Sequence, residues 1–185
     1  LWATCNVGAN SPEDYGDYYA WGETETKSIY DISTYKWCNG SETSFTKYNT
    51  DSNCGIVDNK TILVIEDDAA REYMGGYWRT PTDEELQELI DNCSKVWTNN
   101  YKGTGVAGCI LTSKKEGYTD KYIFLPAAGY KSESKTTETG NSGIYWSSTV
   151  STYYPGRAFG LNVRSDRTLL GSSYRYYGFS VRAVC

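Results

Sequence analysis

The chain has 185 residues and a formal net charge of −5, with 39% hydrophobic and 22% charged residues. These proportions are typical of a globular domain with a hydrophobic core, and they exclude an intrinsically disordered chain. Histidine is absent, which removes the commonest general base and excludes any catalytic triad that contains one.

Two helices are predicted in the first half of the chain. Acidic residues precede the segment 69–74 and two glycines follow it, an order that fits the polarity of a helix. Thr82 and Glu85 then form a capping box ahead of apolar residues at helical spacing, so we expect a helix over 82–93. The polar segment 24–58 is predicted to be an elaborated surface loop.

The remaining elements are predicted to be short strands, either apolar throughout or alternating. Helices among such strands make an α+β domain, with the opening and closing strands side by side and the termini close together. We expect one domain, 1–185, made of a scaffold (1–143) and a C-terminal region (144–185), with a polar loop at 131–142. The predicted strands are 1–8, 106–112, 122–125, 144–149, 158–164 and 179–184.

Eight short motifs occur in an order that resembles a known family. They are LWATCNVGA, PEDYGDYYAWGE, YKWC, DDAA, GGYWRTPTDEEL, LPAAGY, YWSS and GFSVRAV, and they cover nearly the whole chain. They resemble the major paralogous domain family named from Fibrobacter succinogenes, which comprises extracytoplasmic proteins of gut Bacteroidetes and their relatives. The resemblance implies a C-type-lectin-like fold, related to the formylglycine-generating enzyme, and a bacterial cell-surface or secreted location.

The C-terminal region also resembles the variable region of proteins diversified by retroelements. In those proteins adenine-specific mutagenesis rewrites chosen codons between a YWSS motif and a GFSVR motif. Here 145–148 and 178–182 supply these two motifs, and Arg175 stands between two pairs of variable positions. Between Ser151 and Tyr177 there is no Lys, Glu, Gln, Met or Trp, the residues that randomised adenines in an AAC codon cannot produce. A paralogue without a retroelement could have the same composition.

These features predict a ligand-binding surface in the C-terminal region. Tyrosine offers a large contact area for few frozen torsions, and serine and asparagine offer adaptable hydrogen bonds, as in antibody loops. Strand alternation places Leu161 and Val163 in the core and Asn162 and Arg164 outside. The arginines and tyrosines are expected to share one solvent-facing surface. The predicted contact residues are Tyr153, Tyr154, Arg157, Phe159, Asn162, Arg164, Asp166, Thr168, Leu170, Ser172, Ser173, Tyr174, Tyr176 and Tyr177.

A purely structural interpretation of the same tyrosines stays open, because tyrosine also favours half-buried strand positions. It is weaker for Tyr176 and Tyr177, since two consecutive strand residues cannot both face inward. We therefore expect part of this pair to be exposed to a ligand.

Six cysteines occur without a Cys-x-x-Cys pair, which argues against zinc and for disulfides or buried thiols. A nested pairing is favoured because it links near neighbours and joins the two termini; free core thiols are the alternative. The favoured pairs are Cys5 with Cys185, Cys38 with Cys54, and Cys93 with Cys109.

The predicted function is recognition of a protein or glycan ligand, without catalysis. A non-diversified envelope adhesion or structural paralogue is the alternative. An oxidase of the formylglycine-generating type ranks third, because the cysteines of that family are missing near 178–182. The acidic runs 66–68 and 83–85 are interpreted as helix starts and not as a calcium or glycosidase site, so no metal or cofactor is expected.

Two kinds of partner are not expected. The C-terminal region carries arginines without lysines, unlike a nucleic-acid-binding patch. No apolar run reaches the roughly 18 residues needed to cross a bilayer, so we expect no transmembrane segment.

Overall fold

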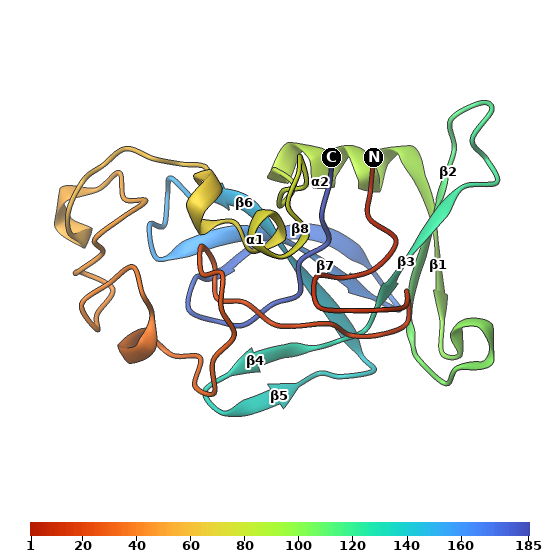
Figure 1. Cartoon of the computed structure of the whole chain (residues 1–185), viewed down its shortest axis with the longest axis horizontal. Helices are drawn as coiled ribbons and strands as arrows, with labels where there is room; N and C mark the ends of the chain where they lie inside the picture. Colours follow the sequence, from red (N-terminus) through yellow and green to blue (C-terminus); the bar gives the residue numbers. More distant parts are fainter.

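Two helices and eight strands make up the regular structure of the chain, an α+β arrangement (Figure 1). This computed structural model describes residues 1–185. The strands form three antiparallel sheets. Neither helix is long and apolar enough to cross a membrane.

The two predicted helices are confirmed. Helix α1 (Ala69–Met74) is capped by the Asp68 side chain, which accepts from the amides of residues 70 and 71, and it ends at Gly75. Helix α2 (Asp83–Asn92) begins after Thr82, whose hydroxyl and backbone amide complete the expected capping box with Glu85. Its apolar face is buried against the sheets, so the helical spacing in the sequence identified the core side correctly.

The strands follow in chain order after α2. The first sheet has the order β1-β2-β3, the hairpin β4-β5 forms the second, and the third has the order β6-β7-β8. The bounds are β1 (Cys93–Thr98), β2 (Gly108–Ser113), β3 (Tyr122–Pro126), β4 (Tyr130–Ser132), β5 (Lys135–Thr137), β6 (Ser142–Val150), β7 (Arg157–Arg164) and β8 (Thr168–Tyr174).

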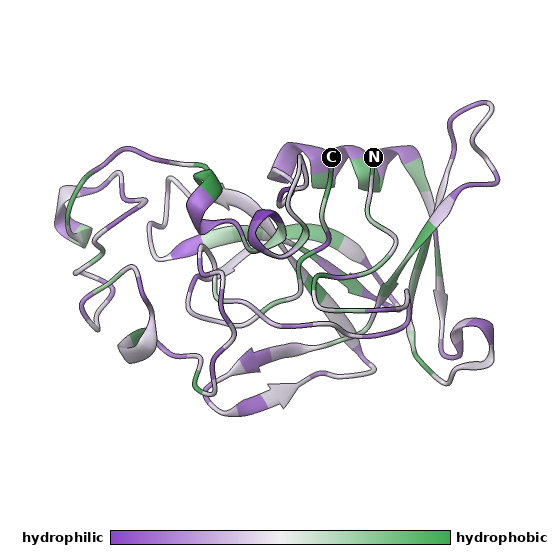
Figure 2. Cartoon of the chain, viewed as in Figure 1, coloured by the Kyte–Doolittle hydropathy of each residue, from purple (hydrophilic) through white to green (hydrophobic).

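The third sheet separates two hydrophobic clusters. On one face Leu161 pairs with Tyr145 and with Leu170, and this row packs with α2 and the first sheet. On the other face Trp146 and Ala158 pack against N-terminal aromatics. Figure 2 shows hydrophobic positions concentrated on these central strands and hydrophilic ones on the outer loops. Because side chains alternate along a strand, β7 contributes to both clusters.

The segment 24–58 has no α-helix or named β-strand, as expected of a loop, but part of it is buried in the core. It contains two short 3₁₀ turns, at Ile32–Thr34 and Ser52–Cys54, and forms the extended orange part of the chain in Figure 1. Four of its five aromatic residues are fully buried and belong to the third core cluster or the first, and Trp37 packs half-buried against both. The buried aromatics are Tyr30, Tyr35, Phe45 and Tyr48.

The two termini lie side by side, as expected. The amino group of Leu1 donates to the carbonyl oxygen of Cys185 at 2.7 Å, and Trp2 forms a bridge with Val184. The segments 1–8 and 179–184 make only isolated bridges, however, and are not regular strands. The closing segment forms isolated β-bridges with residues 19, 145 and 2 in turn, so no single segment pairs with it along its whole length.

Four strands were not predicted. The segment 131–142, expected to be a loop, contains the β4–β5 hairpin, whose turn begins at Glu133 with φ at 53°. Strands β1 and β8 have no clean alternation of apolar and polar residues, so the sequence pattern did not predict them.

All six cysteines are free thiols, so the nested disulfide pairing is wrong. The reason is clearest for Cys93 and Cys109. Cys93 lies opposite Ser113 and Cys109 lies opposite Trp97, so the two thiols are four positions apart along the β1–β2 ladder. That offset is roughly 13 Å along a strand, well beyond the reach of a disulfide.

Candidate ligand-binding surface

Five residues of the C-terminal region form one contiguous group, here called the tyrosine cluster: Tyr154, Arg157, Tyr174, Tyr176 and Tyr177. The Arg157 guanidinium lies 4.8 Å from the ring centre of Tyr174 and 5.5 Å from that of Tyr154. The Tyr174 ring is 5.1 Å from Tyr176 and 5.7 Å from Tyr177. The structure therefore brings these predicted contact residues together from the 152–156 turn, β7, the end of β8 and the turn that follows it.

None of the predicted contact residues is fully buried. Tyr153 and Tyr154 are the most exposed tyrosines of the group, at 87% and 63%. Tyr176 and Tyr177 are both half-buried and lie in a turn. The expectation that consecutive residues face opposite sides holds for a strand and therefore does not apply to them. Tyr176 packs against the aromatics of segment 24–58, and Tyr177 packs against the first core cluster.

Burial and neighbouring acidic groups act on the phenol of Tyr176. Burial is the largest cause, followed by Tyr177 and Glu42, and together they raise the pKa of Tyr176 to about 12. The phenol is therefore neutral at physiological pH and acts there as a hydrogen-bonding group. Sequence reasoning missed Glu42, because it lies far from the cluster in the chain and nothing in its local motif marks it.

The buried side chain of Arg175 supports the tyrosine cluster. Its side chain is 0% exposed, although both flanking residues reach the surface. The guanidinium donates to the carbonyl oxygens of Pro155 at 3.0 Å, Tyr48 at 3.2 Å and Lys47 at 3.0 Å, and to the Tyr35 hydroxyl at 2.9 Å.

Aromatic rings surround the same guanidinium. The rings of Trp21, Tyr35, Phe45 and Tyr48 have their centres 4.8 to 5.9 Å from it. A buried cation is stable only when its donors are satisfied, and here hydrogen bonds and ring faces do this without a carboxylate. Arg175 thus ties the turn carrying Tyr154 to segment 24–58.

Arg164 is placed differently from the expectation. Arg157 and Arg164 occupy opposite ends of β7, and their odd spacing directs them to opposite faces. Arg164 forms an ion pair with Glu138 at 3.1 Å. The prediction that both arginines share one surface with the tyrosines therefore holds for Arg157 and only in part for Arg164, which lies outside the tyrosine cluster but lines an opening together with Tyr177.

The remaining predicted residues divide between the two faces of the third sheet. Leu170 packs against the cluster beneath α2, so its side chain supports the core. Phe159 is half-buried opposite Ser172. Asp166 is exposed in the β7–β8 turn, and Thr168 follows it at the start of β8. Asn162 and Ser173 lie with Arg164 and Tyr177 around a common opening.

That opening, here called the polar pocket, has a volume of about 260 Å³ and includes Tyr130, Glu138, Ser142, Asn162, Arg164, Ser173 and Tyr177 in its wall. The Tyr130 ring lies 5.7 Å from Tyr177 and 5.9 Å from Phe179, which also lines the pocket. Neither the Ser142 hydroxyl nor the Asn162 amide oxygen has a hydrogen-bond partner. Sequence reasoning missed Tyr130, Glu138 and Ser142, which precede the predicted variable segment.

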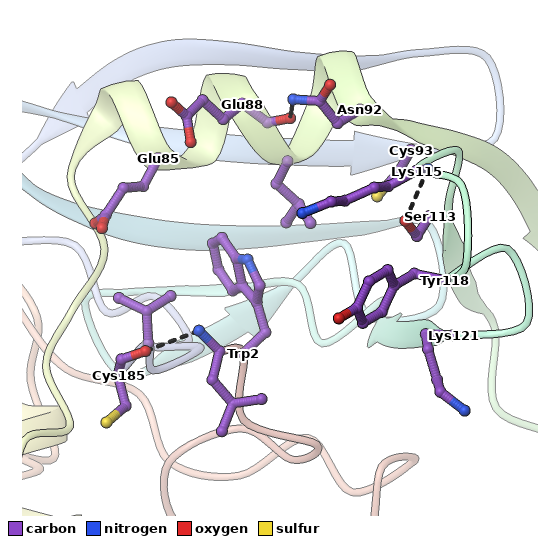
Figure 3. A pocket seen from close by; sticks show the side chains of 13 residues that line it. Trp2, Glu85, Glu88, Asn92, Cys93, Ser113, Lys115, Tyr118, Lys121 and Cys185 are labelled. Carbon is purple, nitrogen blue, oxygen red and sulfur yellow. Dashed lines mark hydrogen bonds between the residues drawn. The ribbon is translucent and has the colours of Figure 1, made fainter.

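A larger hollow of about 620 Å³ lies between α2, the 113–121 hairpin and the chain ends (Figure 3). Trp2 and Tyr118 are the aromatic groups in its wall, with Glu85, Lys115 and other charged residues around them. None of the predicted contact residues lines it. The tyrosine cluster and this hollow are therefore separate features.

The acidic runs near the helices have structural partners. Asp67 accepts from the Tyr48 hydroxyl and the Lys47 ammonium, both at 2.5 Å. Asp68 caps α1 and also accepts from the Thr80 amide and hydroxyl. In the second run, Glu85 accepts two hydrogen bonds of 2.6 Å from Arg79, and that contact lowers the pKa of Glu85. No group of three or more Cys, Asp or Glu side chains is arranged to hold a metal ion.

Comparison with known proteins adds no relative. No protein-family model, curated protein or solved structure matches the chain.

Proposed function

We propose that this protein is an extracytoplasmic ligand-binding protein with a C-type-lectin-like scaffold, whose tyrosine cluster is a sequence-tolerant recognition surface. The observation that carries the proposal is the contrast at Arg175. This residue is buried and each of its three guanidinium nitrogens donates a hydrogen bond, while the tyrosines on either side of it reach solvent. A rigid support beneath exposed Tyr and Arg side chains is the chemistry of a binding site, because these residues dominate binding energy at interfaces.

The scaffold supports the same proposal. Two helices, antiparallel sheets and adjacent termini agree with the C-type-lectin-like fold implied by the family resemblance. Leu161 and Val163 are fully buried while Asn162 and Arg164 are not, so outward residues of β7 can change without emptying the core. We expect a macromolecular ligand, since an interface of standard size buries about 800 Å² on each partner and a surface with this many tyrosines can supply such an area.

Binding to a panel of purified cell-surface proteins and glycans tests the proposal. The test variant is Tyr153→Ser with Tyr154→Ser, both exposed, and the matched control is Tyr118→Ser with Tyr122→Ser, two exposed tyrosines of the β2–β3 hairpin. We expect the first pair to weaken binding about 100-fold, the loss typical of interface hot spots, and the second to leave it unchanged. Equal binding by the wild type and the first pair contradicts the proposal.

Diversification by a retroelement is the more specific part of the proposal, and the nucleotide sequence of the gene and its neighbourhood tests it directly. We expect adenine-rich codons at the predicted contact positions and a near-identical template copy nearby. If both are absent, the chain is a non-diversified envelope paralogue that uses the same surface.

A further inference from the structure

We propose that the polar pocket binds one sugar ring at the end of a glycan, without a metal ion, and so anchors the ligand of the adjacent tyrosine cluster. This inference rests on the proposed function and names the class of ligand. The two features are continuous, because Tyr177 belongs to both: its ring contacts Tyr174 and Tyr176 on one side and Tyr130 on the other.

Polar side chains from three neighbouring strands line the pocket. Ser142 on β6, Asn162 on β7 and Ser173 on β8 contribute two hydroxyls and an amide to its wall. The Ser142 hydroxyl and the Asn162 amide oxygen are themselves closed off from the opening. Asn162 and Ser173 are only half-buried, so their side chains are the polar groups that a ligand in the opening meets.

The charge of the pocket favours a neutral ligand. Its two charged residues, Arg164 and Glu138, form an ion pair at 3.1 Å and so offset each other. The other polar groups are hydroxyls and an amide, which both donate and accept hydrogen bonds. Vicinal hydroxyl groups match this set, because each of them can also donate and accept.

The shape and the aromatic wall favour a ring with an apolar face. Tyr130, Tyr177 and Phe179 form the aromatic side of the pocket. The C–H groups on one face of a pyranose carry partial positive charge and pack against the negative face of an aromatic ring. A volume of about 260 Å³ is smaller than the roughly 300–1,000 Å³ of pockets for drug-sized ligands. The pocket therefore holds one terminal ring, and the remainder of the glycan lies over the tyrosine cluster.

Saturation-transfer NMR with the purified chain tests this inference. The probes are the methyl glycosides of glucose, galactose, mannose and N-acetylglucosamine, each measured with and without a chelator. We expect at least one glycoside to bind with millimolar affinity, unaffected by the chelator. Asn162→Ala and Ser173→Ala should each weaken it about ten-fold, the loss of one or two hydrogen bonds, while Tyr118→Ala leaves it unchanged. Ser173→Ala, a small change on β8, serves if Asn162→Ala fails to fold.

Three outcomes overturn the inference. They are no saturation transfer to any glycoside, equal transfer with Asn162→Ala and Ser173→Ala, and binding of N-acetylarginine amide in place of the glycosides. The last would assign the pocket to an anchoring side chain of a protein ligand. Each is distinguishable from failure of the proposed function, because loss of macromolecular binding on Tyr153→Ser with Tyr154→Ser is measured without any monosaccharide.

Discussion

The guanidinium of Arg182 joins the two ends of the chain through the side chain of Asn6. Two of its nitrogens donate to the Asn6 amide oxygen, at 3.0 and 2.7 Å, and a third bond of 2.9 Å reaches the carbonyl oxygen of Phe124. The side chain is almost completely buried, and this burial lowers the pKa of Arg182. One buried residue thus connects the opening segment, the closing segment and β3.

Replacing Arg182 with Met should destabilise the protein by about 3–5 kcal/mol, because several buried oxygens lose their charged donor at once. Urea unfolding followed by circular dichroism measures the loss. Arg167→Met, at an exposed position of the β7–β8 turn, is the control and should change the unfolding free energy by less than about 0.5 kcal/mol. A similar effect of both substitutions would show that Arg182 does not join the ends.

Arg175→Met should also destabilise the fold, and in addition it should release the 152–156 turn from segment 24–58. The turn loses the bond from Arg175 to the Pro155 carbonyl oxygen, so limited proteolysis should cut at Tyr153 or Tyr154 faster than in the wild type. Arg182→Met, which makes no contact with that turn, is the comparison. Equal cleavage in the two variants would contradict a specific role of Arg175 in holding the turn.

Gly129→Ala should be far more damaging than Gly140→Ala. Both glycines have positive φ, at 68° and 81°, where alanine is strained by about 1–2 kcal/mol. A Cβ at position 129 also overlaps the carbonyl oxygen of Thr137, while one at position 140 meets nothing within 4 Å. We expect losses of about 3–5 and about 1 kcal/mol in urea unfolding. Comparable losses would argue against the tight packing of β5 on Gly129.

Stability should fall at alkaline pH. Burial is the largest cause that raises the pKa of Tyr18 and of Tyr176 from 10.0 to about 12. Between these values the unfolded chain has released protons that the folded chain retains, so the contribution present below pH 10 is lost as pH rises. The urea midpoint measured from pH 8 upwards should therefore decrease, and Tyr176→Phe should reduce the decrease. A midpoint independent of pH would exclude a raised pKa.

The thiols give a direct chemical prediction. All six cysteines are free, Cys185 is exposed, and burial raises the pKa of Cys93 and Cys109. A thiol reagent should therefore modify Cys185 first, and the buried pair only after unfolding. The intact mass should be the same before and after reduction. A mass increase on reduction would instead indicate disulfides.

Sequence patterns identified elements that local chemistry determines. The capping box at Thr82 and the helical spacing of apolar residues located α2, and alternation correctly separated Leu161 from Asn162. The C-terminal tyrosines were also expected to form a group, from their composition and from the resemblance to a variable region. These features depend on residues that are near neighbours in the chain, where spacing carries the physical information.

Features that depend on long-range contacts escaped prediction. Glu42 and Tyr130 lie beside the tyrosine cluster only because segment 24–58 and β4 fold back next to the C-terminal region. The burial of Tyr35 and Tyr48 follows from their contact with Arg175, 140 and 127 residues away in the chain. The separation of Arg164 from Arg157 was predictable, because their odd spacing along β7 directs them to opposite faces.

Three of the four oxygens that bind Arg175 belong to the main chain. Every amino acid carries that carbonyl group, so the residues at positions 47, 48 and 155 can be exchanged without removing a hydrogen-bond acceptor from the arginine. What must be conserved is the path of the backbone. Insertions or deletions in the 152–156 turn should consequently be tolerated far less than substitutions, and sequence change can accumulate around this arginine while its anchorage persists.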